Sequence, residues 1–308
     1  MNIMQRNIKD YLMIGLKGIA MGAADVVPGV SGGTIAFISG IYEELLETIS
    51  KVNFNALKVL KQDGIKAAWN NINGNFIAAL LSGIAISIIS LAKLITYLME
   101  FHTVLLWSFF FGLILSSIYL VGKKIKQWDV PKIISLIIGS AIAFYITILP
   151  PMSSPEALWF IFISGAIAIC AMILPGISGS FILLLLGSYE YVLTSLKDIK
   201  ITVIAVFAAG CITGLLSFSR FLNWMFKKHH DLTVALLTGF LVGSLNKIWP
   251  WKEVLQTRIN SHGKEVPYIE ENVFPQHFDG EPQLMMSLVM LVIGFSLILV
   301  IEKIAEKK

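Results

Sequence analysis

Long runs of apolar residues alternate with short polar or basic connections along this chain. Six of these runs are long enough, at about 1.5 Å per helical residue, to cross the roughly 30 Å hydrocarbon core of a membrane. They cover residues 76–98, 103–121, 131–149, 201–222, 232–249 and 284–301. The runs are too long and too uniformly apolar for barrel strands, so the pattern predicts an all-α integral membrane protein.

A short motif interrupts the apolar pattern twice, at a constant offset of 147 residues, as from Pro28 to Pro175. The copies are Pro28-Gly29-Val30-Ser31-Gly32-Gly33 and Pro175-Gly176-Ile177-Ser178-Gly179-Ser180, followed by Gly40 with Glu43 and by Gly187 with Glu190. The apolar segments on either side would reach only about 21 to 24 Å as helices. We therefore expect two hairpins of half-length helices, at residues 11–49 and 157–194, broken at Pro28, Gly29, Pro175 and Gly176.

Basic residues in the connections predict how the chain crosses the membrane, because short cytoplasmic loops collect lysine and arginine. Arg6 and Lys9 precede the first hairpin, and the next basic clusters lie at 51–66, 123–126 and 227–228, with Lys303 near the C-terminus. The loops between these clusters are mostly poor in basic residues; the exception holds Lys197 and Lys200. Both termini are predicted to be cytoplasmic.

Each half of the chain then holds one hairpin and three spans, an odd number of crossings. Residues 1–150 form the first copy, with spans 76–98, 103–121 and 131–149. Residues 151–308 form the second, with spans 201–222, 232–249 and 284–301, and it must lie upside down relative to the first. Such an inverted-topology repeat, with broken (re-entrant) helices, is typical of secondary transporters. Hairpins that enter from opposite faces should bring their two turns close together, where they would share a single anionic head group.

Composition supports a membrane protein and narrows the chemistry. Of the 308 residues, 56% are hydrophobic and 14% charged, and the mean hydropathy is +0.76. The net charge of +4 arises from loop lysines and offers no case for nucleic acid. Two cysteines and scattered histidines lack ligand spacing, so no metal site, catalytic residue or cofactor is expected.

The residues after each break are candidate phosphate ligands. Helix N-termini there would present free N–H donors and a positive dipole end to an anion. The ligands would be Ser31, Gly32, Gly33 and Thr34 in the first hairpin and Ser178, Gly179 and Ser180 in the second. The alternative is that these small residues only let helices pack closely.

Charged residues in apolar surroundings are the other candidates. Lys93 and Arg220 occupy equivalent repeat positions, where they would neutralise a phosphate or, alternatively, snorkel to the interface. Asp25, whose counterpart is Met172, is a candidate proton or sodium site or a cap of the turn. Glu43 and Glu190 are candidate gating acids or interfacial residues.

The stretch from Ala24 to Thr34, Ala-Asp-Val-Val-Pro-Gly-Val-Ser-Gly-Gly-Thr, with its echo from Leu174 to Ser180, resembles the polyprenyl-phosphate transporter family over essentially the whole chain. The resemblance implies a flippase of the bacterial cytoplasmic membrane that returns undecaprenyl phosphate, a carrier lipid of cell-envelope synthesis, from the outer to the inner leaflet. Transport would be coupled to H⁺ or Na⁺ through Asp25, Glu43 or Glu190.

Two other functions fit parts of the pattern. A transporter of a soluble anion would use the same repeat but enclose its substrate fully. An enzyme acting on a lipid phosphate would need a base beside Ser31 or Ser178, and no histidine is near either in sequence. Homo-oligomerisation, the coupling ion and the preferred tail length are left open by the sequence.

Overall fold

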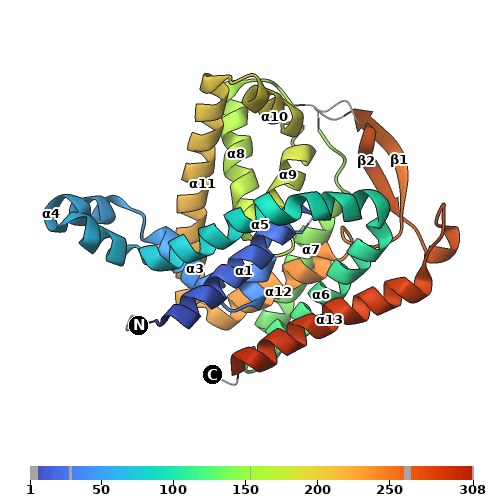
Figure 1. The fold of residues 1–308 in the computed structure, drawn as a ribbon, viewed down its shortest axis with the longest axis horizontal. Coiled ribbons are helices and arrows are strands. Elements are labelled where there is room, and N and C mark those ends of the chain that lie inside the picture. Colours follow the sequence, from blue (N-terminus) through green and yellow to red (C-terminus); the bar gives the residue numbers. More distant parts are fainter. Residues whose placement is uncertain (1–5, 28–29, 153, 260–264, 307–308) are drawn as a thin grey trace.

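The computed structural model describes residues 6–27, 30–152, 154–259 and 265–306, and most of them are helical (Figure 1). The elements of the first half are α1 (Ile8–Val26), α2 (Gly32–Ile38), α3 (Tyr42–Ser50), α4 (Phe54–Asn71), α5 (Gly74–Phe101), α6 (Thr103–Lys123) and α7 (Val130–Ile148). Those of the second half are α8 (Leu158–Ile173), α9 (Gly179–Leu185), α10 (Tyr189–Lys197), α11 (Ile201–Lys228), α12 (His230–Ser244), β1 (Lys252–Ile259), β2 (Glu265–Asn272), the 3₁₀ turn η1 (Pro275–His277) and α13 (Leu284–Glu306).

Four of the six predicted spans are confirmed as helices long and apolar enough to cross a membrane, namely α5, α6, α7 and α11. The last span is also helical, with its apolar part at Leu284–Val300 of α13. The prediction for 232–249 was too long, because α12 ends at Ser244. Asn246 lies beyond that end and donates to Thr147 Oγ1 at 2.7 Å, where the chain turns toward β1.

Each predicted hairpin consists of three helices rather than two. The return arm of the first is broken at Gly40, which has φ +75°, and that of the second at Gly187, with φ +67°. Only glycine adopts this left-handed backbone without strain, so the repeated glycines end α2 and α9 and let α3 and α10 turn away. The bend between α9 and α10 is 109°. The expectation of one continuous return helix was therefore wrong.

Close helix packing repeats between the two halves. α1 packs along α5 as α8 packs along α11, and α6 packs along α13 as α7 packs along α12. A Cβ on Gly18 would collide with the carbonyl oxygen of Leu80, and one on Gly165 with that of Phe207. Gly112 lies in the same way against Leu291 of α13. Small residues thus bring the helix backbones together, while the opposite orientation of the two halves stays a prediction.

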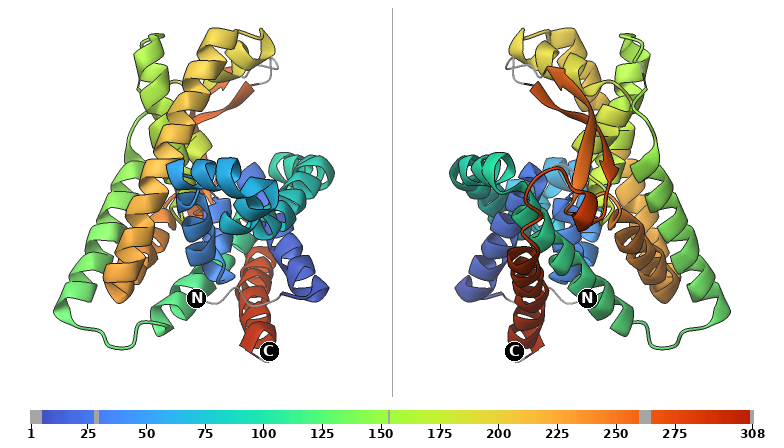
Figure 2. Two further views of the ribbon diagram at one scale, coloured as in Figure 1. Left: turned by 90° about the vertical axis from the view of Figure 1, so that its left-hand side faces the viewer. Right: turned by 90° about the vertical axis from the view of Figure 1, so that its right-hand side faces the viewer.

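Two elements lie outside this repeated framework (Figures 1 and 2). α4 projects from the helical bundle, has no buried residue, and is kinked at Gly64, whose φ is +83°. β1 and β2 form a two-stranded antiparallel sheet in which Lys252 pairs with Asn272 and Ile259 with Glu265. Both segments were expected only as loops.

The surface of the long helices suits a lipid environment. Ile89 on α5 is 81% exposed and Met285 on α13 is 79% exposed, and many other large apolar side chains of these helices are also exposed. Exposing so much apolar surface to water would be unfavourable, whereas the lipid tails of a membrane would cover it. The protein is a multi-pass membrane protein.

Candidate functional site

In the first turn, side chains of the same hairpin accept hydrogen bonds from the N–H groups at the start of α2. Ser31 is the N-cap of α2, and its Oγ accepts a 3.0 Å hydrogen bond from Gly33 N. Asp25, one residue before the end of α1, accepts a 2.7 Å hydrogen bond from Gly32 N through Oδ1. The first donors of α2 are thus occupied by a hydroxyl and a carboxylate. The predicted break residues Pro28 and Gly29 lie outside the described residues.

The second turn has the same sequence motif but a different set of contacts. Pro175 and Gly176 separate α8 from α9, and Gly176 has φ +89°. Ser178 is the N-cap of α9 without a side-chain capping bond; its Oγ lies 2.8 Å from Ser180 Oγ instead. Gly179 begins the helix and is buried. Serine hydroxyls therefore gather at this turn with no carboxylate among these contacts.

The two turns meet, as the repeat predicted. Ser31 Oγ donates to the carbonyl oxygen of Met172 at 2.7 Å, and Gly176 N donates to Thr34 Oγ1 at 2.8 Å. A Cβ on Gly33 would collide with the carbonyl oxygen of Ile173, so only glycine fits between α2 and α8. Ser31 and Thr34 are 0% exposed. The turns form one buried polar cluster inside an apolar helical protein.

Lys93 and Arg220 are not among the contacts of this turn cluster. Lys93 is exposed on α5. Arg220 is exposed on α11, where its Nη2 donates to the carbonyl oxygen of Val52 at 3.1 Å. That contact lies beyond the C-terminal end of α3, whereas Ser31 is at the start of α2. A shared role of these two cations with the turns stays a prediction.

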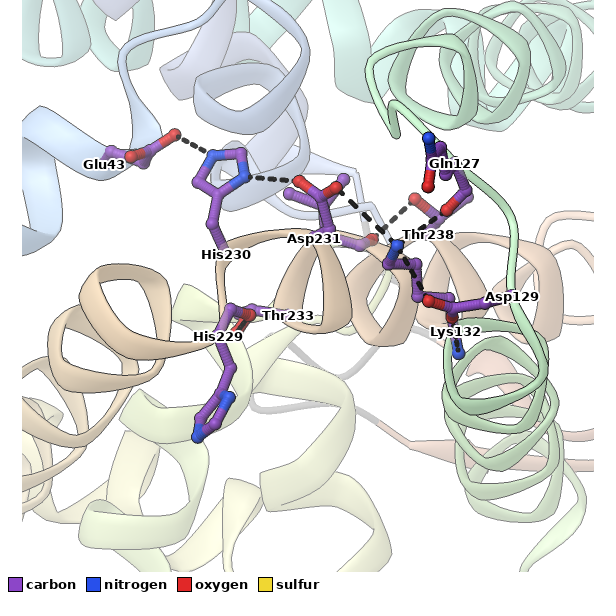
Figure 3. A network of polar contacts seen from close by, with 10 residues as sticks. Glu43, Gln127, Asp129, Lys132, His229, His230, Asp231, Thr233 and Thr238 are labelled. Carbon is purple, nitrogen blue, oxygen red and sulfur yellow. Dashed lines mark hydrogen bonds and ion pairs between the residues drawn. The ribbon is translucent and has the colours of Figure 1, made fainter.

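Glu43 and Glu190 each pair with a basic side chain of the second half. Glu43 Oε1 lies 3.2 Å from His230 Nε2, and the carboxylate side chain is 60% exposed. His230 also contacts Asp231, which faces Lys132 of α7 (Figure 3). Glu190 forms an ion pair with Arg258 of β1. Both acids thus tie a return arm to another element of the chain.

Two lysines and a glutamate beside the second turn were missed by the sequence analysis. Lys247 Nζ lies 4.7 Å from the ring centroid of Phe181, the residue after Ser180, and 3.4 Å from Glu270 Oε2. Lys252 Nζ lies 3.6 Å from the same carboxylate oxygen and 4.2 Å from the centre of the Trp107 ring. Lys252 and Glu270 belong to a segment expected only as a loop. Lys247 lies near the end of the predicted span 232–249, where a charge within an apolar run was the signal that could have singled it out.

The ionisation of this cluster follows from its burial. Burial lowers the pKa of Lys252 from 10.5 to about 8, although Glu270 opposes the change. Burial of Glu270 opposes its ionisation, but the charges of Lys252 and Lys247 outweigh that effect and lower the pKa of the carboxyl group. The cluster therefore keeps one carboxylate between two cations.

The serine hydroxyls of both turns are hydrogen-bonded within the protein. Ser31 Oγ bonds to Met172 O and Ser178 Oγ to Ser180, and in the described part of the chain neither hydroxyl has a histidine among its hydrogen-bond partners. Within those same residues, no three His, Cys, Asp or Glu side chains gather as a metal ion would require. Hydroxyls and backbone N–H groups in apolar surroundings suit the recognition of an anion.

A known protein family and two named proteins are similar to this chain. A sequence model of a family described as undecaprenyl phosphate translocase-like matches residues 21–266. The chain is 49% identical over 302 residues to a polyprenyl-phosphate transporter of Vibrio cholerae serotype O1, covering 97% of this chain and 98% of the relative. It is 31% identical over 253 residues to a polyprenyl-phosphate transporter of Staphylococcus aureus, covering 76% and 85%. No solved structure matches.

Proposed function

Because the chain belongs to the undecaprenyl phosphate translocase-like family, we propose that it transports polyprenyl phosphate across the bacterial cytoplasmic membrane. The direction we propose is from the outer to the inner leaflet, which returns the carrier lipid undecaprenyl phosphate to cell-envelope synthesis. The observation that supports this most is the contact between the two turns through Ser31, Met172, Thr34 and Gly176. It puts polar groups of both halves at one place inside an apolar protein.

The physical demands of such a substrate fit a site of this kind. A phosphate head is very costly to place in hydrocarbon, so it needs polar groups along its path. The isoprenoid tail is apolar and can stay in lipid. A protein that carries only the head needs a small polar cluster and a lateral opening between helices, with no cavity for the whole lipid.

Phosphate binding by the turns requires their present hydrogen bonds to be exchanged. Gly32 N is bonded to Asp25, Gly33 N to Ser31, and Gly176 N to Thr34. We propose that the head replaces these partners when the turns separate, with Ser178, Gly179 and Ser180 contributing from the second half. The arrangement described here is then the closed one, in which the protein satisfies its own donors.

We propose that the carboxylates couple transport to a proton or sodium gradient. Asp25 is the strongest candidate, because it binds directly to the first turn at Gly32 N. Protonation of Asp25, or a sodium ion bound to it, would weaken its hold on that N–H and free the donor for phosphate. Glu43 and Glu190 would follow as gates through their pairs with His230 and Arg258.

The proposal is tested by transport in proteoliposomes that contain polyprenyl phosphate. An impermeant phosphatase added outside removes phosphate only from head groups in the exposed leaflet, so translocation raises the final fraction hydrolysed above that of protein-free vesicles. We expect the double variant S31A and S178A to slow this increase strongly. The matched control S90A alters an exposed serine of α5 whose Oγ bonds only within its own helix, to Ile86 O.

Three results would contradict parts of the proposal. Wild-type protein that does not raise the hydrolysed fraction would exclude lipid translocation. Uptake of inorganic phosphate by the same vesicles would favour a transporter of a soluble anion. Equal rates with and without a pH or sodium gradient would exclude ion coupling while leaving the translocation itself intact.

A further inference from the structure

A basic pocket lies on the surface, away from the turn cluster. It has a volume of about 420 Å³ and lies between the end of α3, the start of α4 and the C-terminal part of α11. Among the described residues, three cationic side chains line it, those of Arg220, Lys227 and Lys228, and no acidic side chain does. The pocket therefore concentrates positive charge in a small concave space.

The lining residues are held by specific contacts. Arg220 uses one Nη2 bond to Val52 O at 3.1 Å, and its guanidinium group carries five N–H donors in all. Lys228 Nζ lies 5.5 Å from the centre of the Trp224 ring. Asn223 Nδ2 donates to Ser50 Oγ at 3.0 Å, which joins α11 to the end of α3. Arg220, Lys228 and Asn223 thus each have a contact within the protein at the pocket.

The start of α4 adds to the same field. Asn53 lines the pocket and caps α4, accepting hydrogen bonds from Asn55 N at 2.9 Å and Ala56 N at 3.1 Å. The N-terminal end of a helix carries partial positive charge. This helix end lies beside the pocket, because its capping residue Asn53 lines it, so its partial charge adds to that of the three side-chain cations.

The surroundings of the pocket match the depth of lipid head groups. Phe54 and Leu57 at the start of α4 are 87% and 49% exposed. Lys58 and Lys61 are exposed on the same helix. Exposed apolar and basic residues on one helix, with Trp224 nearby, are typical of a segment at the membrane surface. The basic residues predict that this surface is the cytoplasmic one.

From these observations we propose that the pocket of Arg220, Lys227 and Lys228 binds the phosphate head group of an anionic lipid at the basic face of the membrane. The planar guanidinium group can bind two phosphate oxygens, and the lysines neutralise the remaining charge. Two lipids could supply this head: polyprenyl phosphate that leaves the turns, or a resident phospholipid. The first source rests on the proposed function, and the second does not.

The pocket is separate from the turn cluster along the chain and in its contacts. α2 and α3 lie between Ser31, which caps the first turn, and Ser50, which lines the pocket. If the head is that of the substrate, the pocket is a second binding site for the substrate head group, at the membrane surface. Arg220 then acts there rather than at the turns.

The test compares two variants with the same change in charge. R220Q, K227Q and K228Q together remove the three cations of the pocket. K58Q, K61Q and K66Q together remove three exposed cations of α4 that do not line it. Binding to the full-length protein in a neutral detergent is measured by native mass spectrometry and thermophoresis. The probes are farnesyl phosphate, dioctanoyl phosphatidylglycerol and inorganic phosphate.

We expect the pocket variant to bind one or both lipid probes at least about tenfold more weakly than the wild type, and the α4 variant to change affinity by less than about twofold. Equal weakening by both variants would overturn the proposal, because it would show diffuse attraction. Unchanged affinity in the pocket variant would overturn it too. Inorganic phosphate that binds as tightly as the lipids would exclude a lipid site.

Two further comparisons separate this inference from the proposed function. A pocket-dependent preference for farnesyl phosphate identifies the substrate head, and pocket-dependent binding of phosphatidylglycerol identifies a resident phospholipid. The S31A and S178A variant should keep pocket binding even where it loses translocation. Gel filtration and thermal unfolding of each variant show that the fold is retained, and all six substituted side chains are exposed.

Discussion

The two turns share a sequence motif, but one position has opposite chemistry. Asp25 and Met172 are equivalent in the repeat, and each lies against the first glycine of the following helix: a Cβ on Gly32 would meet the Asp25 carboxylate, and one on Gly179 would meet the side chain of Met172. The first turn is therefore closed by a charged group bonded to its own backbone. The second is covered by an apolar side chain.

Symmetry of packing and asymmetry of chemistry coexist in this protein. Packing of the helix pairs repeats between the halves, which suits two equivalent arrangements of the whole. A carboxylate within apolar surroundings is costly and usually functional. Because only one turn carries it, the proposed ion binding would act on one half of the protein only.

We expect the largest effect on transport when the first turn is given the apolar residue that the second turn has at the equivalent position. The substitution Asp25→Met removes the acceptor of Gly32 N and the charge together. We expect translocation in proteoliposomes to fall about a hundredfold, which corresponds to about 2.7 kcal/mol in the barrier. Met172→Leu is the control and should keep the wild-type rate. Normal transport by the Asp25→Met variant would show that the difference between Asp25 and Met172 plays no part in transport.

A second exchange tests the contact between the turns. Gly33 corresponds to Ser180, but a Cβ at Gly33 would collide with the carbonyl oxygen of Ile173. Gly33→Ser should therefore lower the free energy of unfolding by about 1–3 kcal/mol, as overpacking does. Thermal unfolding in detergent measures the change. Gly15→Ala is the control, since its Cβ would lie 3.7 Å from the nearest atom, Ala79 O; equal stability of both variants would contradict the close approach.

The two N-cap serines should differ in importance. Ser31 bonds to Gly33 N and to Met172 O, whereas Ser178 bonds to Ser180. We expect Ser31→Ala to cost about 1 to 2 kcal/mol of stability and Ser178→Ala about half as much. Urea or thermal unfolding of the two variants under the same conditions measures this difference in stability. A larger loss from Ser178→Ala would reverse the assignment of the first turn as the stabilising one.

The smallest expected effect is a dependence on pH near the second turn. The pKa of Lys252 is lowered to about 8 in the folded protein from 10.5, so between these values the unfolded chain holds a proton that the folded chain has lost. The free energy of unfolding should therefore rise with pH across this window relative to the variant Lys252→Met. Melting temperatures from pH 7 to 10 measure the difference; parallel curves would show that burial does not perturb this lysine.

Sequence was a sound guide where a pattern extends over many residues or occurs twice. Long apolar runs predict α5, α6, α7 and α11, because membrane thickness leaves few alternatives for them. The repeated turns led to the expectation that they meet, which the bond from Ser31 to Met172 confirms. Gly40 and Gly187 were visible in the motif, but their left-handed backbone was not, so the extra break in each return arm was missed.

Features that depend on single segments were beyond the reach of the sequence. α4 contains lysines and apolar residues without a buried face, and its pattern did not distinguish it from a basic loop. Lys247 and Lys252 come together only because α12 ends at Ser244 and the chain turns into β1. Arg220 shares a repeat position with Lys93, yet its partner Val52 belongs to a connection that the repeat does not contain.

The pairing of α6 with α13 has a consequence for how the protein is made. Gly112 of α6 packs against Leu291 of α13, which is synthesised after all the other helices that the structure describes. Until α13 is synthesised and inserted, that face of α6 has no protein partner of its own and must be covered by lipid or by the insertion machinery. Assembly of the first half is therefore completed only after the helices of the second half have been made.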